Sequence, residues 1–120
     1  MKLALIAHDG KKAEMVAFIM DHKSMLSKVE LFATGTTGGH IERAGFNVTC
    51  LLSGPLGGDA QIATMVAEKR IDAVIFFRDP LDKHPHEPDV LMLLRICDVH
   101  NVPLATNPAT ARLIIEGLTN

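Results

Sequence analysis

The stretch NVTCLLSGPLGGD, residues 47–59, joins an apolar run to a glycine-rich turn and a single carboxylate. The run NVTCLL (47–52) has the length and apolar character of a β-strand, and a helical pattern begins at Asp59. Three glycines and a proline between them exceed what a tight turn needs, which indicates that a ligand approaches the main chain closely. The stretch therefore predicts a strand, a binding loop and a helix in succession.

The same succession of strand and helix recurs along the chain. Apolar runs of strand length are residues 2–7, 30–33, 47–52, 73–77 and 102–106. Helical patterns are residues 11–22, 37–44, 59–69, 88–100 and 108–117. Continuous apolar runs predict strands that are buried on both faces. Five alternations predict a single domain over residues 1–120, an α/β fold of three layers (α/β/α) with a five-stranded parallel sheet between helices.

Composition excludes two classes of protein. The hydrophobic fraction of 48% predicts a packed globule, and the apolar stretches are shorter than the ~20 residues of a membrane span. The net charge is −2 and there is no Trp or Tyr, so the sequence lacks the basic surface and stacking side chains that nucleic acids require. Neither a membrane nor a nucleic acid is expected as a partner.

The cysteines and the first residues point to an intracellular protein. Cys50 and Cys97 lie in apolar segments without metal-ligand spacing, which predicts two reduced thiols in the core. The first apolar run is followed at once by His8, Asp9 and two lysines, with no cleavage site, so it predicts a strand and not a signal peptide. The expected location is the cytoplasm.

Ligands of such sheets bind at the carboxyl ends of the strands. The segments that follow the five strands hold nearly all the glycine and polar chemistry, and they are residues 8–12, 34–39, 53–59, 78–80 and 106–108. Loops of Gly, Ser and Thr at helix N-termini bind anions through main-chain N–H groups, hydroxyls and the helix dipole. The two glycine-rich loops match neither the P-loop nor the dinucleotide pattern, so a nucleotide is not expected.

A phosphate site is the better interpretation of these loops, although glycine-rich turns also occur for purely geometric reasons. Thr36, Thr37 and Ser53 offer hydroxyl groups, and Lys12 supplies a cation in the first turn of the first helix. Acids and histidines of the same edge could then perform chemistry on a bound ester; these are His8, Asp9, Asp59, Asp79, His86 and Asp89.

Each acid and histidine also has a structural interpretation. Asp59 and Asp89 could cap the helices that they begin. His84 and His86 are two residues apart, with no cysteine and no obvious third ligand, so they give only a weak indication of a metal site. Together the residues indicate proton abstraction beside the carbonyl of a phosphorylated sugar fragment. That reaction needs a carboxylate base, a histidine that donates to the carbonyl oxygen and a site that binds the phosphate.

Several motifs carry a more specific signal: ALIAHDGKK (4–12), ATGTTGG (33–39), LSGPLGGD (52–59), FFRDPL (76–81), PHEPDV (85–90) and PLATNPATA (103–111). Through them the sequence resembles the methylglyoxal synthase family over essentially the whole chain. The resemblance implies a sheet order of 3-2-1-4-5 and conversion of dihydroxyacetone phosphate to methylglyoxal and inorganic phosphate. It also implies that no metal or organic cofactor is needed and that the protein is a cytoplasmic homohexamer.

The resemblance also assigns roles to single residues. It implies that Asp59 is the general base and that His86 is the electrophile that shuttles a proton. Contacts to phosphate or substrate are assigned to His8, Lys12, Thr34, Gly35, Thr36, Thr37, Ser53 and Gly54. Supporting roles fall to Asp9, Asp79 and Asp89. Longer members carry a C-terminal extension whose basic residue reaches a neighbouring subunit, and with Asn120 as the last residue that contact is not expected here.

Two other functions fit parts of the pattern. A non-catalytic module of the same fold could bind a phosphorylated effector, but it would have no use for Asp59 and His86. A metal-dependent phosphatase could be built on His84, His86 and Asp89, and chelators would inhibit it. The enzyme of the methylglyoxal synthase type is favoured because base, electrophile and phosphate loops occur together in one 120-residue chain.

Overall fold

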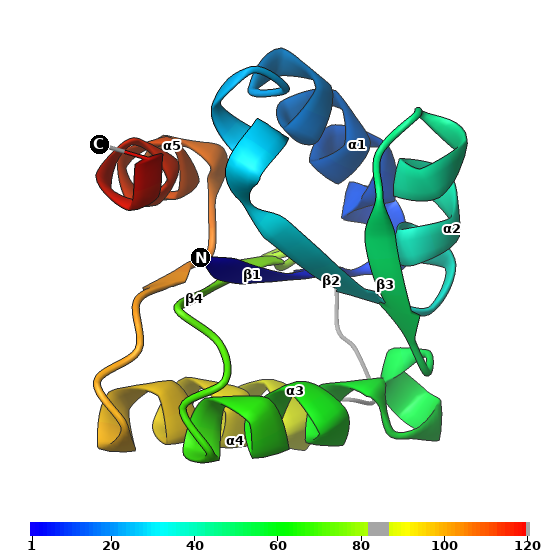
Figure 1. Cartoon of the computed structure of the whole chain (residues 1–120). Helices are drawn as coiled ribbons and strands as arrows, with labels where there is room; N and C mark the ends of the chain where they lie inside the picture. The colour runs from blue at the N-terminus through cyan, green and yellow to red at the C-terminus, as the bar shows by residue number, and fades with distance from the viewer. Residues whose placement is uncertain (82–86, 120) are drawn as a thin grey trace.

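The computed structural model describes residues 1–81 and 87–119 and shows a parallel sheet between two layers of helices (Figure 1). The strands are β1 (Lys2–Ala7), β2 (Glu30–Thr34), β3 (Val48–Leu51), β4 (Ala73–Phe77) and β5 (Leu104–Ala105). The α-helices are α1 (Lys12–Asp21), α2 (Gly35–Arg43), α3 (Gly58–Ala67), α4 (Glu87–Val99) and α5 (Pro108–Thr119). Short 3₁₀ turns are η1 (Asp9–Lys11), η2 (Met25–Lys28) and η3 (Gly54–Leu56).

The sheet has the order β3-β2-β1-β4-β5, and all its pairs are parallel. This confirms the expected order and the three-layer α/β/α class. β1 lies at the centre, where Ala4 pairs with Phe32 of β2 on one side and with Val74 of β4 on the other. Because every strand points the same way, the carboxyl ends of four neighbouring strands meet at one edge of the sheet.

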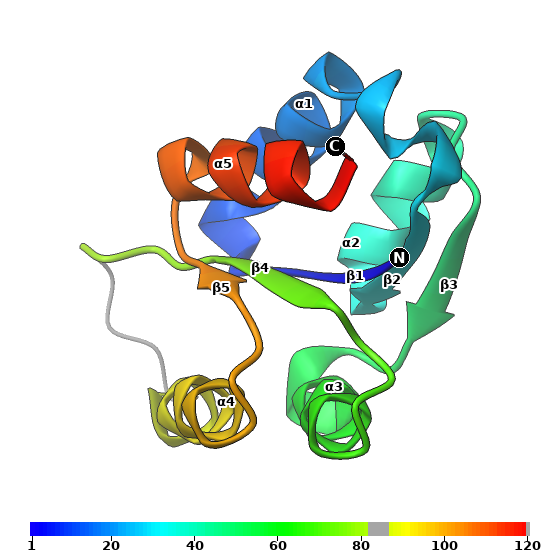
Figure 2. The ribbon, with the colours of Figure 1, turned by 60° about the vertical axis from the view of Figure 1, so that its left-hand side comes forward.

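Two hydrophobic clusters hold the layers together. Figures 1 and 2 show α1, α2 and α5 on one face of the sheet and α3 and α4 on the other. On one face α1, α2 and α5 pack on alternate strand residues such as Leu5 and Ile75, and Ile19 of α1 is fully buried there. On the other face α3 and α4 cover Ile6 and Phe76. Alternation of side chains between the two faces thus explains why the strand runs are apolar throughout.

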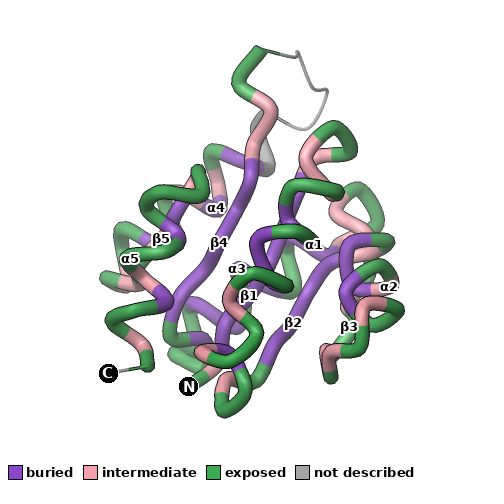
Figure 3. The backbone as a smooth tube through the Cα atoms, turned by 90° about the horizontal axis from the view of Figure 1, so that it is seen from above, coloured by how far each residue is buried: buried purple, intermediate pink, exposed green. Residues whose placement is uncertain are grey.

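β3 departs from the expectation that every strand is buried on both faces. It is an edge strand, and Thr49 and Cys50 are exposed, whereas β1, β2 and β4 are buried along most of their length (Figure 3). Of the two cysteines that were expected in the core, Cys97 is buried and Cys50 is not. An edge strand has a neighbouring strand on one side only. An apolar run does not show whether its strand lies at the edge or in the centre of a sheet, so the sequence alone did not reveal the exposure of β3.

Element boundaries differ from the predicted ones by up to two residues, and two of these differences are at α2 and β5. α2 begins at Gly35, two residues before the predicted start, so Gly35 and Thr36 also belong to the helix. β5 comprises only Leu104–Ala105 of the predicted run. Within the described part of the chain, no helix is long and apolar enough to cross a membrane.

Candidate active site

A cavity of about 260 Å³ opens at the carboxyl ends of β1, β2, β3 and β4. Its lining consists of Ile6, Ala7, His8, Asp9, Lys12, Thr34, Gly35, Thr36, Thr37, Ser53, Gly54, Pro55, Asp59 and Phe76. The residues that the sequence assigned to substrate and phosphate are all in this lining, together with Asp59 and Asp9. Sequence reasoning missed Ile6, Ala7, Pro55 and Phe76, because a cavity wall of apolar residues has the same sequence signal as the core.

Of the three remaining expected site residues, only Asp79 has a described side chain. Asp79 follows β4 and does not reach the cavity wall. His86 lies outside the described residues, as does His84, so the catalytic histidine and the metal hypothesis that uses both of them stay predictions. Asp89 falls within α4, and its side chain is outside the description. Among the described residues, no group of three His, Cys, Asp or Glu side chains is arranged to hold a metal ion.

The loop after β3 places a carboxylate against bare backbone. A Cβ atom at Gly54 would lie 3.1 Å from Oδ1 and 3.3 Å from Oδ2 of Asp59, so the carboxylate packs directly on the glycine. Asp59 is only 7% exposed and sits in the first turn of α3. Gly57 occupies the N-cap position of that helix, so the interpretation of Asp59 as the cap does not hold. The helix dipole favours a negative charge at this place.

The junction between β2 and α2 packs closely against the loop after β3. Gly35 has φ +46°, and a Cβ atom there would lie 2.8 Å from Cα of Ser53, which leaves room only for glycine. The amide of Gly35 donates to the carbonyl of Leu52 at 3.2 Å. Gly35 therefore fixes the contact between the two segments. Its own N–H is bonded to the carbonyl of Leu52 and so is not available to a ligand.

Thr37 presents the clearest sign of a ligand. Its side chain is 1% exposed, and its Oγ1 atom has no hydrogen-bond partner among the described residues, although Thr37 lines the cavity. A buried hydroxyl without a partner is unfavourable by about 1–3 kcal/mol. The first amides of a helix also lack intrahelical acceptors, so Thr36 and Thr37 at the start of α2 add donors of the same kind. This corner of the cavity is suited to an anion.

Lys12, the first residue of α1, supplies the positive charge. Its Nζ atom donates to Oγ1 of Thr36 and pairs with Oδ1 of Asp9 at 2.8 Å. The cation therefore bridges the loop after β1 and the start of α2. A single ammonium beside the donors of α2 is an arrangement that binds phosphate groups.

His8 is held in one orientation by its neighbours. The backbone N–H of Asp79 donates to Nδ1 of His8 at 3.0 Å, so the neutral imidazole carries its proton on Nε2. The ring meets Phe76 edge to face, with 5.2 Å between ring centroids. Asp79 also accepts a bond from the N–H of Leu81 at 3.2 Å, which orders the turn after β4. Asp79 thus supports His8 through its main chain, without lining the cavity.

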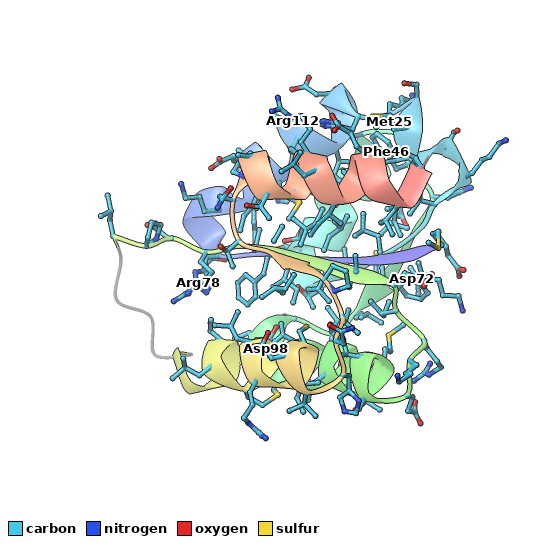
Figure 4. All side chains as sticks on the ribbon, turned by 90° about the vertical axis from the view of Figure 1, so that its left-hand side faces the viewer. Met25, Phe46, Asp72, Arg78, Asp98 and Arg112 are labelled. Carbon is cyan, nitrogen blue, oxygen red and sulfur yellow. The ribbon has the colours of Figure 1, made fainter. Side chains whose placement is uncertain are left out.

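Arg78 follows β4 at the same end of the sheet. Figure 4 shows it at the opposite end of β4 from Asp72, which precedes that strand and accepts a bond from the N–H of Lys2 at 2.7 Å. The carboxyl edge of the sheet thus carries the positive residue Arg78 as well as Lys12. Fold and cavity together define an α/β domain with a polar cavity, suited to an anion, beside a buried carboxylate.

Comparison with known proteins gives the same class. Residues 14–106 match the family model described as "MGS-like domain". The methylglyoxal synthase of Carboxydothermus hydrogenoformans is 58% identical over 119 residues, which is 98% of each chain. That of Caldicellulosiruptor saccharolyticus is 60% identical over 119 residues, with 98% of this chain and 84% of the relative covered. The crystal structure of methylglyoxal synthase from Elizabethkingia anophelis superposes with a TM-score of 0.90 at 47% identity, over 95% of this chain and 76% of that one.

The chain belongs to the methylglyoxal synthase family. The resemblance seen in its motifs is thereby confirmed, and so is the lyase class of the enzyme. The non-catalytic effector module is not favoured, because relatives of this identity over nearly the whole chain are named as enzymes.

Proposed function

We propose that this protein acts as a methylglyoxal synthase whose base is Asp59 and whose phosphate site is formed by α2 and Lys12. The observation that carries the proposal is that a buried carboxylate, a buried hydroxyl without a partner and an ammonium line one cavity. A cavity of about 260 Å³ is smaller than the ~300–1,000 Å³ of sites for drug-sized ligands, which suits a triose phosphate.

The phosphate group of dihydroxyacetone phosphate binds at the start of α2 in this proposal. The hydroxyl of Thr37 gains the partner that it lacks in the unliganded fold, and the amides of Thr36 and Thr37 donate along the helix axis. Lys12 neutralises part of the charge. Ser53 and Gly54 complete the site from the loop after β3. Four or five charge-assisted hydrogen bonds, each worth ~1.5–3 kcal/mol, are enough to hold a small ester.

The first chemical step is proton abstraction. Asp59 takes a proton from the hydroxymethyl carbon, and the electron pair moves onto the carbonyl oxygen to give an enediol phosphate. His8 donates from Nε2 toward that oxygen, since Nδ1 is engaged by the amide of Asp79. His86, which lies outside the described residues, is proposed as the second donor and proton shuttle. Stabilising charge that develops only in the transition state accelerates the step.

The second step is elimination of phosphate. The hydroxyl on the former hydroxymethyl carbon loses its proton and becomes the aldehyde carbonyl, the enediol double bond shifts to the phosphate-bearing carbon, and the C–O bond there breaks, so that phosphate leaves with the electron pair of that bond. The resulting enol becomes methylglyoxal by gaining a proton at that carbon and losing the proton of its hydroxyl. Cleavage needs the C–O bond nearly perpendicular to the enediol plane. A phosphate held by α2 on one side of the cavity, with the base on the other loop, fixes such a torsion.

One assay separates the three candidate functions. Purified protein is mixed with dihydroxyacetone phosphate, and methylglyoxal is measured with and without a chelator. Methylglyoxal formation that the chelator leaves unchanged supports the proposal. Release of phosphate without methylglyoxal, abolished by the chelator, would identify a metal-dependent phosphatase, and binding without turnover would identify an effector module.

The proposal extends to assembly and location. A homohexamer would cover the open edge strand β3 and the apolar side chains near it, of which Leu52 is 51% and Leu56 is 74% exposed. Sedimentation at micromolar concentration measures the mass, and a monomer alone would contradict this part.

A cytoplasmic location suits an enzyme that draws a charged triose phosphate out of glycolysis, because such esters do not cross membranes. Cell fractionation tests this location.

A further inference from the structure

Asp9 is bound to the cation that the proposed function assigns to the phosphate group. Its Oδ1 atom lies 2.8 Å from Nζ of Lys12, and the same Nζ donates to Thr36 at the start of α2. The side chain of Asp9 is 94% exposed, whereas that of Lys12 is 23% exposed. Both residues line the cavity. One ammonium is therefore shared between a solvent-facing carboxylate and the phosphate corner.

We propose that Asp9 competes with phosphate for Lys12 and so limits how tightly the cavity holds phosphate and its esters. The inference rests on the proposed function, because it concerns the binding and release of that same ligand. Asp9 is a positioning residue in this scheme, since it acts on the ligand through Lys12.

The physical basis is the difference in charge and exposure between the two competitors. An exposed ion pair changes an equilibrium constant by only about 1.4- to 5-fold, so the bond of Asp9 to Lys12 is easily exchanged. A phosphate group brings more negative charge and meets further donors on Thr36 and Thr37, so it displaces Asp9 from Lys12 when it binds. The displaced carboxylate still weakens the complex, because binding must break its ion pair. The same competition helps inorganic phosphate to leave after elimination.

The chain holds a matched pair that does not face the cavity. Nζ of Lys11 lies 3.2 Å from Oε2 of Glu14, with the same spacing of three residues, and neither residue lines the cavity. Removing the charge of Glu14 therefore changes the local charge and the helix terminus as removing that of Asp9 does. It leaves Lys12 untouched.

The experiment measures phosphate binding directly and turnover in parallel. Inorganic phosphate is titrated by calorimetry into the whole protein and into its Asp9→Asn and Glu14→Gln variants, and KM for dihydroxyacetone phosphate is measured for each. We expect Asp9→Asn to lower the phosphate Kd and KM together by about 2- to 5-fold, and Glu14→Gln to leave both within error. The difference between wild type and Asp9→Asn should shrink in 1 M salt, where the Debye length is about 3 Å.

A double variant tests whether Asp9 acts through Lys12. In the Lys12→Ala background the Asp9→Asn change should have no effect on phosphate Kd, because the cation for which the two anions compete is gone. An equal improvement in that background would show that Asp9 repels the ligand directly, and it would overturn the inference. Unchanged or weaker phosphate binding by Asp9→Asn alone would overturn it as well.

The titration also distinguishes failure of the inference from failure of the proposed function. If wild type binds phosphate and produces methylglyoxal while Asp9→Asn shows no gain in affinity, only the inference fails. If wild type binds no phosphate at millimolar concentration, the phosphate site itself is wrong and the inference falls with it.

Discussion

The two glycine-rich loops of the cavity look alike in sequence but use their glycines differently. In the segment after β2, called the first loop here, Gly35 begins α2, and Gly38 lies inside that helix at a place where a Cβ atom would come 2.8 Å from Sγ of Cys50. In the loop after β3, Gly54 makes room for the carboxylate of Asp59. In the proposed function, the first loop thus brings a helix N-terminus to the ligand, and the second brings the carboxylate that acts as base.

This difference implies a division of labour between binding and chemistry. The first loop contributes hydroxyls and amides on Thr36 and Thr37, none of which can remove a proton from carbon. The second contributes the buried carboxylate of Asp59 and contacts the first at Gly35 and Ser53. Variants in the two loops should therefore separate phosphate affinity from turnover.

The largest expected effect comes from the base in the second loop. Asp59→Asn keeps the shape of the side chain but cannot accept a proton at neutral pH, so methylglyoxal production should fall by about 10²–10⁴-fold. Phosphate affinity should stay close to that of the parent, because the first loop is intact. Activity is assayed on protein whose melting temperature matches wild type.

Retention of activity within tenfold of wild type by Asp59→Asn would remove this residue from the mechanism. His86 or another carboxylate at the edge of the sheet would then have to be tested as the base.

The second effect concerns the cation shared with the first loop. Lys12→Ala removes a charge-assisted bond worth ~1.5–3 kcal/mol, so affinity for substrate and for inorganic phosphate should fall together by about 10- to 100-fold. Phosphate should compete with dihydroxyacetone phosphate in the parent, and inhibition constants measure both effects. Weaker substrate binding with unchanged phosphate inhibition would show that the phosphate site has been assigned to the wrong residues.

The third effect pairs a loss of binding with a gain in stability. Thr37→Val removes a buried hydroxyl without changing the shape of the side chain, so phosphate affinity should fall by about tenfold while the free energy of unfolding without ligand rises by up to about 3 kcal/mol. Thr64→Val is the control, because Thr64 lies on α3 and its hydroxyl bonds the carbonyl of Ala60 at 3.0 Å. A Thr37 variant that unfolds more easily and binds phosphate normally would contradict the role of this hydroxyl.

The smallest expected effect concerns Cys50, whose side chain lies against Gly38 of α2. Burial, and to a lesser extent the charge of Asp98, raises the pKa of the Cys97 thiol from 9.0 to about 11, so Cys97 stays a thiol at pH 8. Cys50, in contrast, is exposed on β3. Iodoacetamide should label Cys50 and spare Cys97 in the folded protein, as mass spectrometry would show. Replacing Cys50 by Ala should change phosphate affinity by no more than about twofold; a larger change would mean that Cys50 holds α2 in place.

Much of the fold follows from apolar runs in the sequence. The predicted strands 2–7 and 73–77 coincide with β1 and β4, because both are buried on two faces and read as continuous hydrophobic segments. The start of α2 was predicted two residues late, since a glycine at position 35 signals a loop when only local propensity is considered.

The candidate site could be anticipated where chemistry is visible in the residue type. Lys12, Thr37 and Asp59 stood out as polar residues after apolar runs, and parallel topology brings such residues together. The wall formed by Ile6 and Phe76 could not be anticipated, because apolar side chains give no sign of whether they face a cavity or the core. The role of Asp79 was hidden for a different reason: its main chain, and not its carboxylate, orients His8.

The position of β1 in the centre of the sheet has a consequence for how the chain folds. β1 pairs with β2, whose residues lie about 28 positions away, and with β4, about 70 positions away, as the pairs Lys2–Glu30 and Leu3–Ala73 show. Until β4 docks, one flank of β1 has unpaired backbone groups, and Phe76 is missing from the cavity wall. Because distant pairings slow folding, docking of β4 is expected to be the late event that closes the sheet and completes the active site together.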